Sequence, residues 1–197
     1  MEFSPNGDRL CAVFNDTECT VTLYKTTTGE IVASSRGIPA PACVHGIAYA
    51  PSGDEICLVG TKQIKFFTSV TNTKRALEVQ MGRIGKIGVK QTFFCVSYMH
   101  DDAIVGAADG CLYKFHNYIC VQVVQAHTIN EPILSIHVSH TQGILVTGGK
   151  DCLVKSWDNT LNEIGQSIDM SEDLDGDGRA DCGTINGAIT SVEISGR

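Results

Sequence analysis

The chain has 197 residues and a formal net charge of −7, with 43% hydrophobic and 19% charged residues. This composition is typical of a folded core rather than of a disordered chain. The acidic balance argues against binding of nucleic acid or of an anionic membrane, because such surfaces usually present a basic patch. No apolar stretch reaches the roughly 20 residues of a membrane helix, and no signal peptide is visible. We therefore expect a cytoplasmic protein without nucleic-acid or membrane partners.

Nine cysteines are spread along the chain, and no two have the C-x-x-C spacing of a zinc or redox motif. Their number is odd, and most lie within apolar runs such as Leu10-Cys11-Ala12-Val13. These features disfavour a disulfide framework. They predict small buried side chains in a reducing compartment.

Four segments in chain order share one plan, which is a short apolar run, a turn, and a second β-rich run that ends in an aromatic residue. The aromatic residues recur at intervals of roughly 40–50 residues, close to the repeat of a four-stranded propeller blade. They are Tyr24, Phe67, Phe115 and Trp157. No longer segment shows convincing helical periodicity, so nearly all elements are predicted to be short strands.

Turn motifs separate these strands and predict the order of the blades. Ser4-Pro5-Asn6-Gly7-Asp8 and Pro51-Ser52-Gly53-Asp54 are predicted hairpin turns between the first two strands of a blade. We predict an all-β chain, a β-propeller fragment of about four blades, each a four-stranded antiparallel sheet. The blades are placed at about 1–37, 38–82, 83–126 and 127–170, followed by an acidic insert at 171–183 and the first strand of a further blade at 189–194.

The fourth segment carries the most specific pattern. His127 precedes Asp151 by 24 residues, Thr147 precedes it by four, and Trp157 follows it by six. In these residue types and spacings the segment resembles the WD40 repeat, whose structural tetrad joins a His, a Ser or Thr, an Asp and a Trp. The resemblance implies WD-type blades and a hydrogen-bond relay among these four side chains, since an indole N–H only donates and buried polar groups need partners.

A Ser/Thr–His–Asp grouping is also the signature of a hydrolase triad. This alternative is disfavoured because the offsets match the structural relay and because Thr147 lies inside a predicted strand, next to Gly148-Gly149. The other three blades keep the pattern only in part. Their acid or hydroxyl and aromatic positions are Glu18 and Tyr24, Thr61 and Phe67, and Asp109 and Phe115, with Val105 in the place of Thr147.

The stretch from Thr92 to Leu161 resembles the echinoderm microtubule-associated-protein-like family, which carries a tandem pair of atypical propellers. The resemblance rests on the ordered motifs Phe93-Phe94-Cys95-Val96, Gln125-Ala126-His127, Thr147-Gly148-Gly149-Lys150-Asp151 and Trp157-Asp158-Asn159-Thr160-Leu161. It implies a cytoskeletal protein that contacts tubulin or microtubules. The family binds microtubules mainly through a basic, coiled-coil-bearing region, which nothing here resembles, so we expect that contact to come from a full-length parent.

The acidic segment after the fourth blade is the sharpest chemical signal. Carboxylates stand at loop positions 1, 3, 5 and 9, Gly178 allows a tight turn at position 6, and Arg179 offers a backbone carbonyl at position 7. Such spacing of oxygen ligands predicts a Ca²⁺ site made by Asp173, Asp175, Asp177, Arg179 and Asp181. Position 12 is Thr184 rather than Glu, so the loop is not an EF-hand and resembles the calcium hairpins of integrin-type propellers. The alternative is a solvated acidic insert.

Together these features predict a non-catalytic protein-interaction scaffold. The alternative is a propeller enzyme that uses the central channel, which would need converging titratable groups that the sequence does not offer outside the relay. Truncation of a larger propeller is favoured over a small closed ring, because the chain begins near the end of a first strand and stops after the first strand of another blade.

Overall fold

The computed structural model describes residues 1–69, 76–170, 189 and 191–192. In this part of the chain every regular element is a β-strand, and no helix that could cross a membrane is present. The predicted acidic insert and the calcium ligands lie outside the described residues, and so does most of the predicted strand at 189–194.

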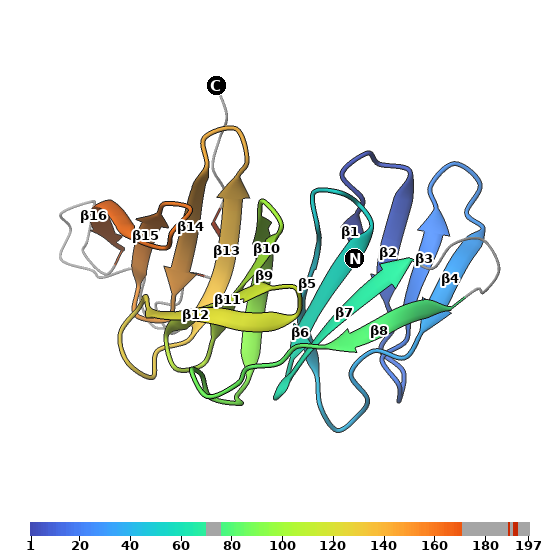
Figure 1. The fold of residues 1–197 in the computed structure, drawn as a ribbon, viewed down its shortest axis with the longest axis horizontal. Coiled ribbons are helices and arrows are strands. Elements are labelled where there is room, and N and C mark those ends of the chain that lie inside the picture. Colours follow the sequence, from blue (N-terminus) through green and yellow to red (C-terminus); the bar gives the residue numbers. More distant parts are fainter. Residues whose placement is uncertain (70–75, 171–188, 190, 193–197) are drawn as a thin grey trace, which may run out of the picture.

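In the part of the chain that the structure describes, sixteen strands form four antiparallel sheets of four strands each, and in every sheet the strands follow one another in chain order (Figure 1). The first blade holds β1 (Glu2–Phe3), β2 (Arg9–Val13), β3 (Val21–Lys25) and β4 (Ile31–Ser35). The second holds β5 (Val44–Tyr49), β6 (Glu55–Gly60), β7 (Gln63–Ser69) and β8 (Leu77–Met81). The third holds β9 (Phe93–Met99), β10 (Asp102–Ala107), β11 (Cys111–His116) and β12 (Ile119–Gln125). The fourth holds β13 (Ile133–Ser139), β14 (Ile144–Gly149), β15 (Leu153–Trp157) and β16 (Glu163–Asp169).

The hairpin turns form where the sequence predicted them. Gly7 N donates to Ser4 O at 2.8 Å between β1 and β2, and Gly53 N donates to Ala50 O at 2.9 Å between β5 and β6. Both glycines have positive φ, 72° and 77°, a conformation that favours glycine because it lacks a Cβ. The turns therefore let each first strand fold back on its second.

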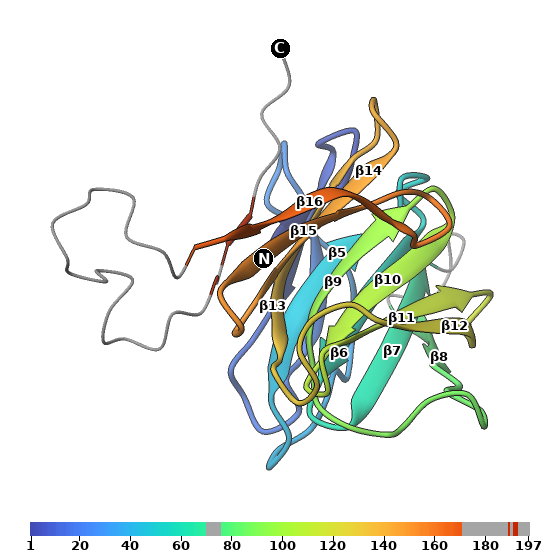
Figure 2. The same cartoon turned by 90° about the vertical axis from the view of Figure 1, so that its left-hand side faces the viewer.

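The blades stand side by side, with β1, β5, β9 and β13 innermost, as Figures 1 and 2 show. Each interface between neighbouring blades has its own apolar core, since a sheet buries its faces against its neighbours. Cys11, Leu23, Ile56 and Phe67 belong to the core between the first and second blades. Phe66, Phe93, Tyr113 and Phe115 belong to the core between the second and third, and Ile104, Leu112, Ile133 and Trp157 to that between the third and fourth.

The predicted fold class is confirmed by these four stacked sheets. Beyond the fourth blade, Ile189 lies where another first strand would begin. Cys95 Sγ in β9 donates to Ile133 O at 3.4 Å, and Ser135 Oγ in β13 donates to Ile189 O at 3.2 Å in the same manner. Ile189 therefore occupies against the fourth blade the place that Ile133 occupies against the third.

Candidate functional site: a buried relay and a groove along the inner strands

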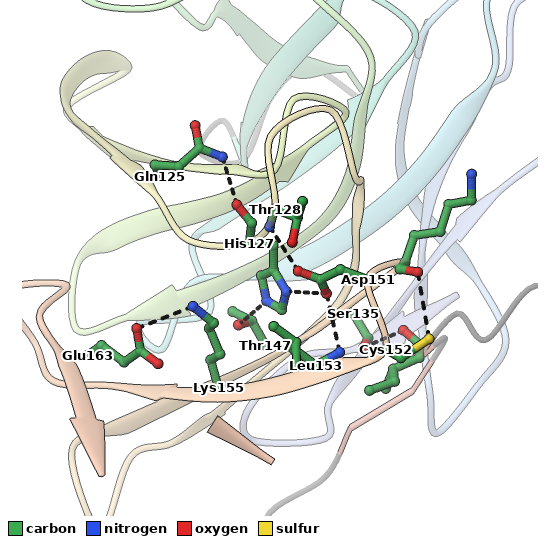
Figure 3. A network of polar contacts seen from close by, with 12 residues as sticks. Gln125, His127, Thr128, Ser135, Thr147, Asp151, Cys152, Leu153, Lys155 and Glu163 are labelled. Carbon is green, nitrogen blue, oxygen red and sulfur yellow. Dashed lines mark hydrogen bonds and ion pairs between the residues drawn. The ribbon is translucent and has the colours of Figure 1, made fainter. Parts of the chain in front are cut away.

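The structure brings the four predicted relay residues of the fourth blade into one chain of hydrogen bonds. Trp157 Nε1 donates to Thr147 Oγ1 at 2.9 Å, and Thr147 Oγ1 lies 2.8 Å from His127 Nε2. The other ring nitrogen, His127 Nδ1, lies 2.8 Å from Asp151 Oδ1. Figure 3 shows His127 between Thr147 and Asp151.

Asp151 also ties together two backbone segments. Its carboxylate accepts from Thr128 N at 2.8 Å, in the linker that enters the blade, and from Leu153 N at 3.2 Å, at the start of β15 (Figure 3). Burial alone would raise the pKa of Asp151. The hydrogen bonds from Thr128, His127 and Leu153 together outweigh burial and hold this pKa below its usual value. The carboxylate thus stays charged and fastens the linker to the blade.

His127 is neutral in this arrangement. Its side chain is 0% exposed, and burial lowers its pKa below the usual value, although the hydrogen bond to Asp151 opposes the shift. A neutral imidazole donates from Nδ1 to Asp151 and accepts at Nε2 from the Thr147 hydroxyl, which in turn accepts from the indole. Every member of the relay therefore has a partner.

The relay has the residue types of a hydrolase triad but not the accessibility. Thr147 is 0% exposed, His127 is 3% exposed and Trp157 is 2% exposed. A nucleophile must reach a substrate atom, and the Thr147 oxygen is instead occupied by an indole N–H inside the core. The arrangement stabilises the blade and offers no catalytic hydroxyl.

The third blade makes an equivalent connection with different groups. Asp109 accepts from Cys111 N at 3.0 Å and from the Tyr113 hydroxyl at 3.0 Å. The Tyr113 hydroxyl in turn accepts from Val89 N at 3.2 Å and from Gln91 Nε2 at 2.8 Å, both in the linker before β9. A tyrosine therefore does here what His127 does in the fourth blade.

In the first blade the predicted acid position has another role. Glu18 forms an exposed ion pair with Arg36 at 3.5 Å, whereas Asp16 caps the turn by accepting from Thr20 N at 2.9 Å and Glu18 N at 3.1 Å. Glu18 keeps the sequence offset to Tyr24, but the carboxylate that accepts from the turn amides in this blade belongs to Asp16, two residues earlier.

In the second blade Thr61 stands at the acid position and accepts from Cys43 N at 3.2 Å. Its hydroxyl therefore keeps one linker contact of the missing carboxylate.

A groove of about 550 Å³ runs across the innermost strands of all four blades. It lies toward the end of the strands where the hairpin turns after β1 and β5 are located, and Pro5 and Pro51 of those turns line it. The strand residues that line it include Glu2 and Phe3, Ile47 and Ala48, Val96 and Ser97, and Ile136 and His137. Because it draws side chains from four separate blades, the stacking of the sheets creates this surface.

Tyr49 and Tyr98 lie at corresponding positions of β5 and β9 and line the groove, but their hydroxyl groups differ in hydrogen bonding. The Tyr98 hydroxyl donates to Glu55 Oε1 at 2.7 Å, across the interface between the second and third blades. The Tyr49 hydroxyl lies across the interface between the first and second blades, buried, without a hydrogen-bond partner among the described residues. Arg9 begins β2 where Glu55 begins β6, so the position of the carboxylate that accepts from Tyr98 is taken here by a guanidinium, which only donates.

Among the described residues no three His, Cys, Asp or Glu side chains come together in a way that would hold a metal ion. The candidate calcium ligands Asp173, Asp175, Asp177, Arg179 and Asp181 all lie outside that part of the chain. The ends of the segment that contains them are held on the fourth blade. Met170 N donates to Cys152 O at 2.9 Å, and Ile189 N donates to Gly149 O at 3.1 Å.

Sequence reasoning missed the groove, the Tyr113 connection and the inequality of the two tyrosines. The sequence contains one signal for the Tyr113 connection, since Tyr113 follows Asp109 by four residues. No local pattern indicates, however, that the Tyr113 hydroxyl will bind a linker residue some 20 positions earlier in the chain. A comparison with protein families finds that the model described as WD domain, G-beta repeat, matches residues 118–158. The match covers β12 to β15 and contains all four relay residues.

Proposed function

Because the chain contains a WD40 repeat within a stack of four-stranded sheets, we propose that it is a non-catalytic protein-interaction scaffold of the cytoplasm. WD40 domains generally bind other proteins. The observation that carries the proposal is the combination of a polar relay whose His, Thr and Trp are buried with an open groove shared by four blades. Rigid sheets hold the groove in place, which lowers the entropic cost of binding a partner.

Ser97 and His137 are half-buried polar residues among those that line the groove, one on β9 and the other on β13. A partner that inserts a side chain between them would desolvate both, and well-packed, desolvated contacts contribute most to affinity. Charged substitutions at these two positions should therefore weaken binding, whereas a similar change on the outer strand β12 should not.

The test is quantitative affinity purification with the wild-type chain and three variants. We expect Ser97→Glu and His137→Glu to reduce recovery of specific partners about tenfold, as loss of a contact worth about 1.4 kcal/mol would. Val121→Glu, on an exposed position of β12, is the matched control and should leave recovery unchanged. Equal recovery by all four proteins would contradict a role for the groove. Turnover of a small substrate by the wild type, lost in an Asp151→Asn variant whose folding is intact, would favour the enzyme alternative instead.

Within the scaffold class, we propose a microtubule-linked role, on the resemblance to the echinoderm microtubule-associated-protein-like family. The net charge of −7 would repel the acidic tails of tubulin at moderate range, so this chain should not carry the contact by itself. Co-sedimentation with polymerised tubulin should leave the chain in the supernatant and bring a full-length parent into the pellet. A full-length parent that stays in the supernatant would contradict the microtubule-linked role, and the proposal that the groove binds a partner would still stand.

We propose Ca²⁺ as a ligand of the loop made by Asp173, Asp175, Asp177, Arg179 and Asp181. The support is the ligand spacing and the attachment of both ends of the segment to the fourth blade. Ca²⁺ should raise thermal stability by mass action, about 2.7 kcal/mol at a hundredfold excess over Kd, and Mg²⁺ should substitute poorly. Asp175→Ala should lose most of the gain. Identical melting in Ca²⁺, Mg²⁺ and chelator would leave a solvated acidic insert.

A further inference from the structure

A second cavity, of about 480 Å³, lies between the first and second blades, away from the inner groove. One wall is the loop between β2 and β3, and the other is the linker between β4 and β5. Each wall contributes one cysteine, Cys19 from the loop and Cys43 from the linker. Neither thiol takes part in the relay or in the groove.

The backbone holds both walls of this cavity firmly. The linker is docked on the loop directly before Cys19, where Gly37 N donates to Glu18 O at 3.1 Å and Ala40 N donates to Thr17 O at 3.0 Å. Cys19 N donates to Asp16 O at 3.1 Å within the loop itself. These hydrogen bonds therefore fix the position of the linker relative to the loop.

Cys43 is held from the second blade. Its N–H donates to Thr61 Oγ1 at 3.2 Å, and its carbonyl accepts from Thr61 N at 2.9 Å. The two cysteines therefore face one cavity from two fixed backbones. They also differ in access, since Cys43 is exposed whereas Cys19 is buried.

The difference in access sets an order of reaction. Burial, with smaller contributions from Asp16 and Cys43, raises the pKa of Cys19 above the usual value, so little thiolate forms there at neutral pH. An attacking thiol must be both ionised and reachable, and Cys43 is the reachable one. Cys19 is the buried thiol that shares its cavity.

We propose that Cys43 and Cys19 form an inter-blade dithiol, a modification site for small-molecule disulfides such as glutathione disulfide. In the first step the Cys43 thiolate attacks one sulfur of the reagent. The reagent S–S bond breaks, and one glutathione thiolate leaves, which takes up the proton that Cys43 lost. In the second step the Cys19 thiolate attacks the Cys43 sulfur, the mixed disulfide breaks, and the second glutathione thiolate leaves. Two protein thiols are oxidised, and one disulfide is reduced to two thiols.

The product is a disulfide that joins the first blade to the second across the cavity. The bridge restricts the unfolded chain between the two cysteines, so oxidation should raise the unfolding midpoint. The bridge also spans the cavity between the loop and the linker. The site thus lets thiol–disulfide balance control how firmly the first blade is attached.

The test is treatment of the full chain with glutathione disulfide, alkylation of free thiols after denaturation, and peptide mapping without reduction. Cleavage after Glu as well as Lys and Arg is required, because Glu18 separates Cys19 from Cys11, and Glu55 separates Cys43 from Cys57. We expect a linked Cys19–Cys43 peptide pair that a dithiol reductant abolishes. Cys19→Ser should stop at the mixed disulfide on Cys43, and Cys43→Ser should leave Cys19 unmodified.

Cys152→Ser is the matched control, since Cys152 is a partly exposed thiol on the fourth blade and its loss should not change the bridge. The proposal is overturned if wild-type protein stops at the mixed disulfide, links Cys43 to another cysteine or gives no adduct. It is also overturned if Cys19 reacts equally well in Cys43→Ser. A higher unfolding midpoint after oxidation in wild type, absent in both single variants, would support the bridge in the folded chain.

Discussion

The third and fourth blades solve the same structural problem with different chemistry. In both, an Asp in the turn between the second and third strands must hold the linker that enters the blade. Asp151 does so through His127 and Thr128 N, whereas Asp109 does so through the Tyr113 hydroxyl, which holds Val89 N and Gln91. The difference teaches that two neighbouring blades can connect the turn carboxylate to the entering linker through different side chains.

The largest effect should come from removing the carboxylate of the fourth blade. Asp151→Ala leaves the His127 Nδ1–H and the N–H groups of Thr128 and Leu153 without their acceptor, at a cost of about 3 kcal/mol. Urea unfolding followed by the fluorescence of Trp157, the single tryptophan, measures it. Asp109→Ala in the third blade should cost about half as much, because it removes one side-chain bond and one turn bond. Equal costs would contradict the view that the fourth blade depends more on its acid.

Thr147 in β14 and Val105 in β10 occupy corresponding positions of the fourth and third blades, and exchanging their side chains tests whether the two blades depend on the same relay. Thr147→Val should destabilise the chain by about 2 kcal/mol, since it leaves the indole N–H and His127 Nε2 unpaired inside the core. Val105→Thr in the third blade should also destabilise, by about 1 kcal/mol, because it buries a hydroxyl where Phe115 offers no donor. Both changes in stability are measured as shifts of the urea midpoint in variants whose m-value is unchanged. A stabilising Val105→Thr would show that the third blade still accommodates the original relay.

The two blades should respond differently to pH. The pKa of His127 is lowered in the folded chain, so below about pH 6.5 the unfolded state binds a proton that the folded state does not. Stability should therefore fall as pH decreases from 7 to 5, by at most about 1.4 kcal/mol per pH unit, and the fall should be smaller in His127→Gln. In the third blade burial raises the pKa of Tyr113 to about 12, so Tyr113→Phe should cost the same at pH 7 and at pH 5. A pH-independent difference between wild type and His127→Gln would contradict a neutral His127.

The two groove tyrosines give the last comparison, in which one of the two substitutions should have almost no cost. Tyr98→Phe should cost about 1.5 kcal/mol because it removes a hydrogen bond to a carboxylate. Tyr49→Phe should be neutral or stabilise by up to about 1 kcal/mol, since the hydroxyl that it removes is buried without a partner among the described residues. Thermal unfolding of both variants gives the comparison. A clear destabilisation by Tyr49→Phe would reveal a partner outside the described residues.

The sequence by itself determined the elements with local causes. Hairpin turns at Ser4–Asp8 and Pro51–Asp54, and the recurrence of Tyr24, Phe67, Phe115 and Trp157, predicted the order of strands and the four sheets. The spacing of His127, Thr147, Asp151 and Trp157 singled out the fourth blade, and the structure brings these four side chains into contact. Turn chemistry and strand alternation act within a few residues, so they can be read along the chain.

Only the tertiary structure decided which side chains meet across blades and linkers. The Tyr98 hydroxyl donates to Glu55, whereas the Tyr49 hydroxyl has no acceptor among the described residues. Tyr113 takes the bridging role that a histidine has in the fourth blade, and Asp16 rather than Glu18 caps the turn of the first blade. The groove and the cavity that Cys19 and Cys43 share likewise depend on how separate blades stack. The physical reason is that these contacts join residues far apart in the chain. Their partners are set by the packing of whole sheets, which no local pattern encodes.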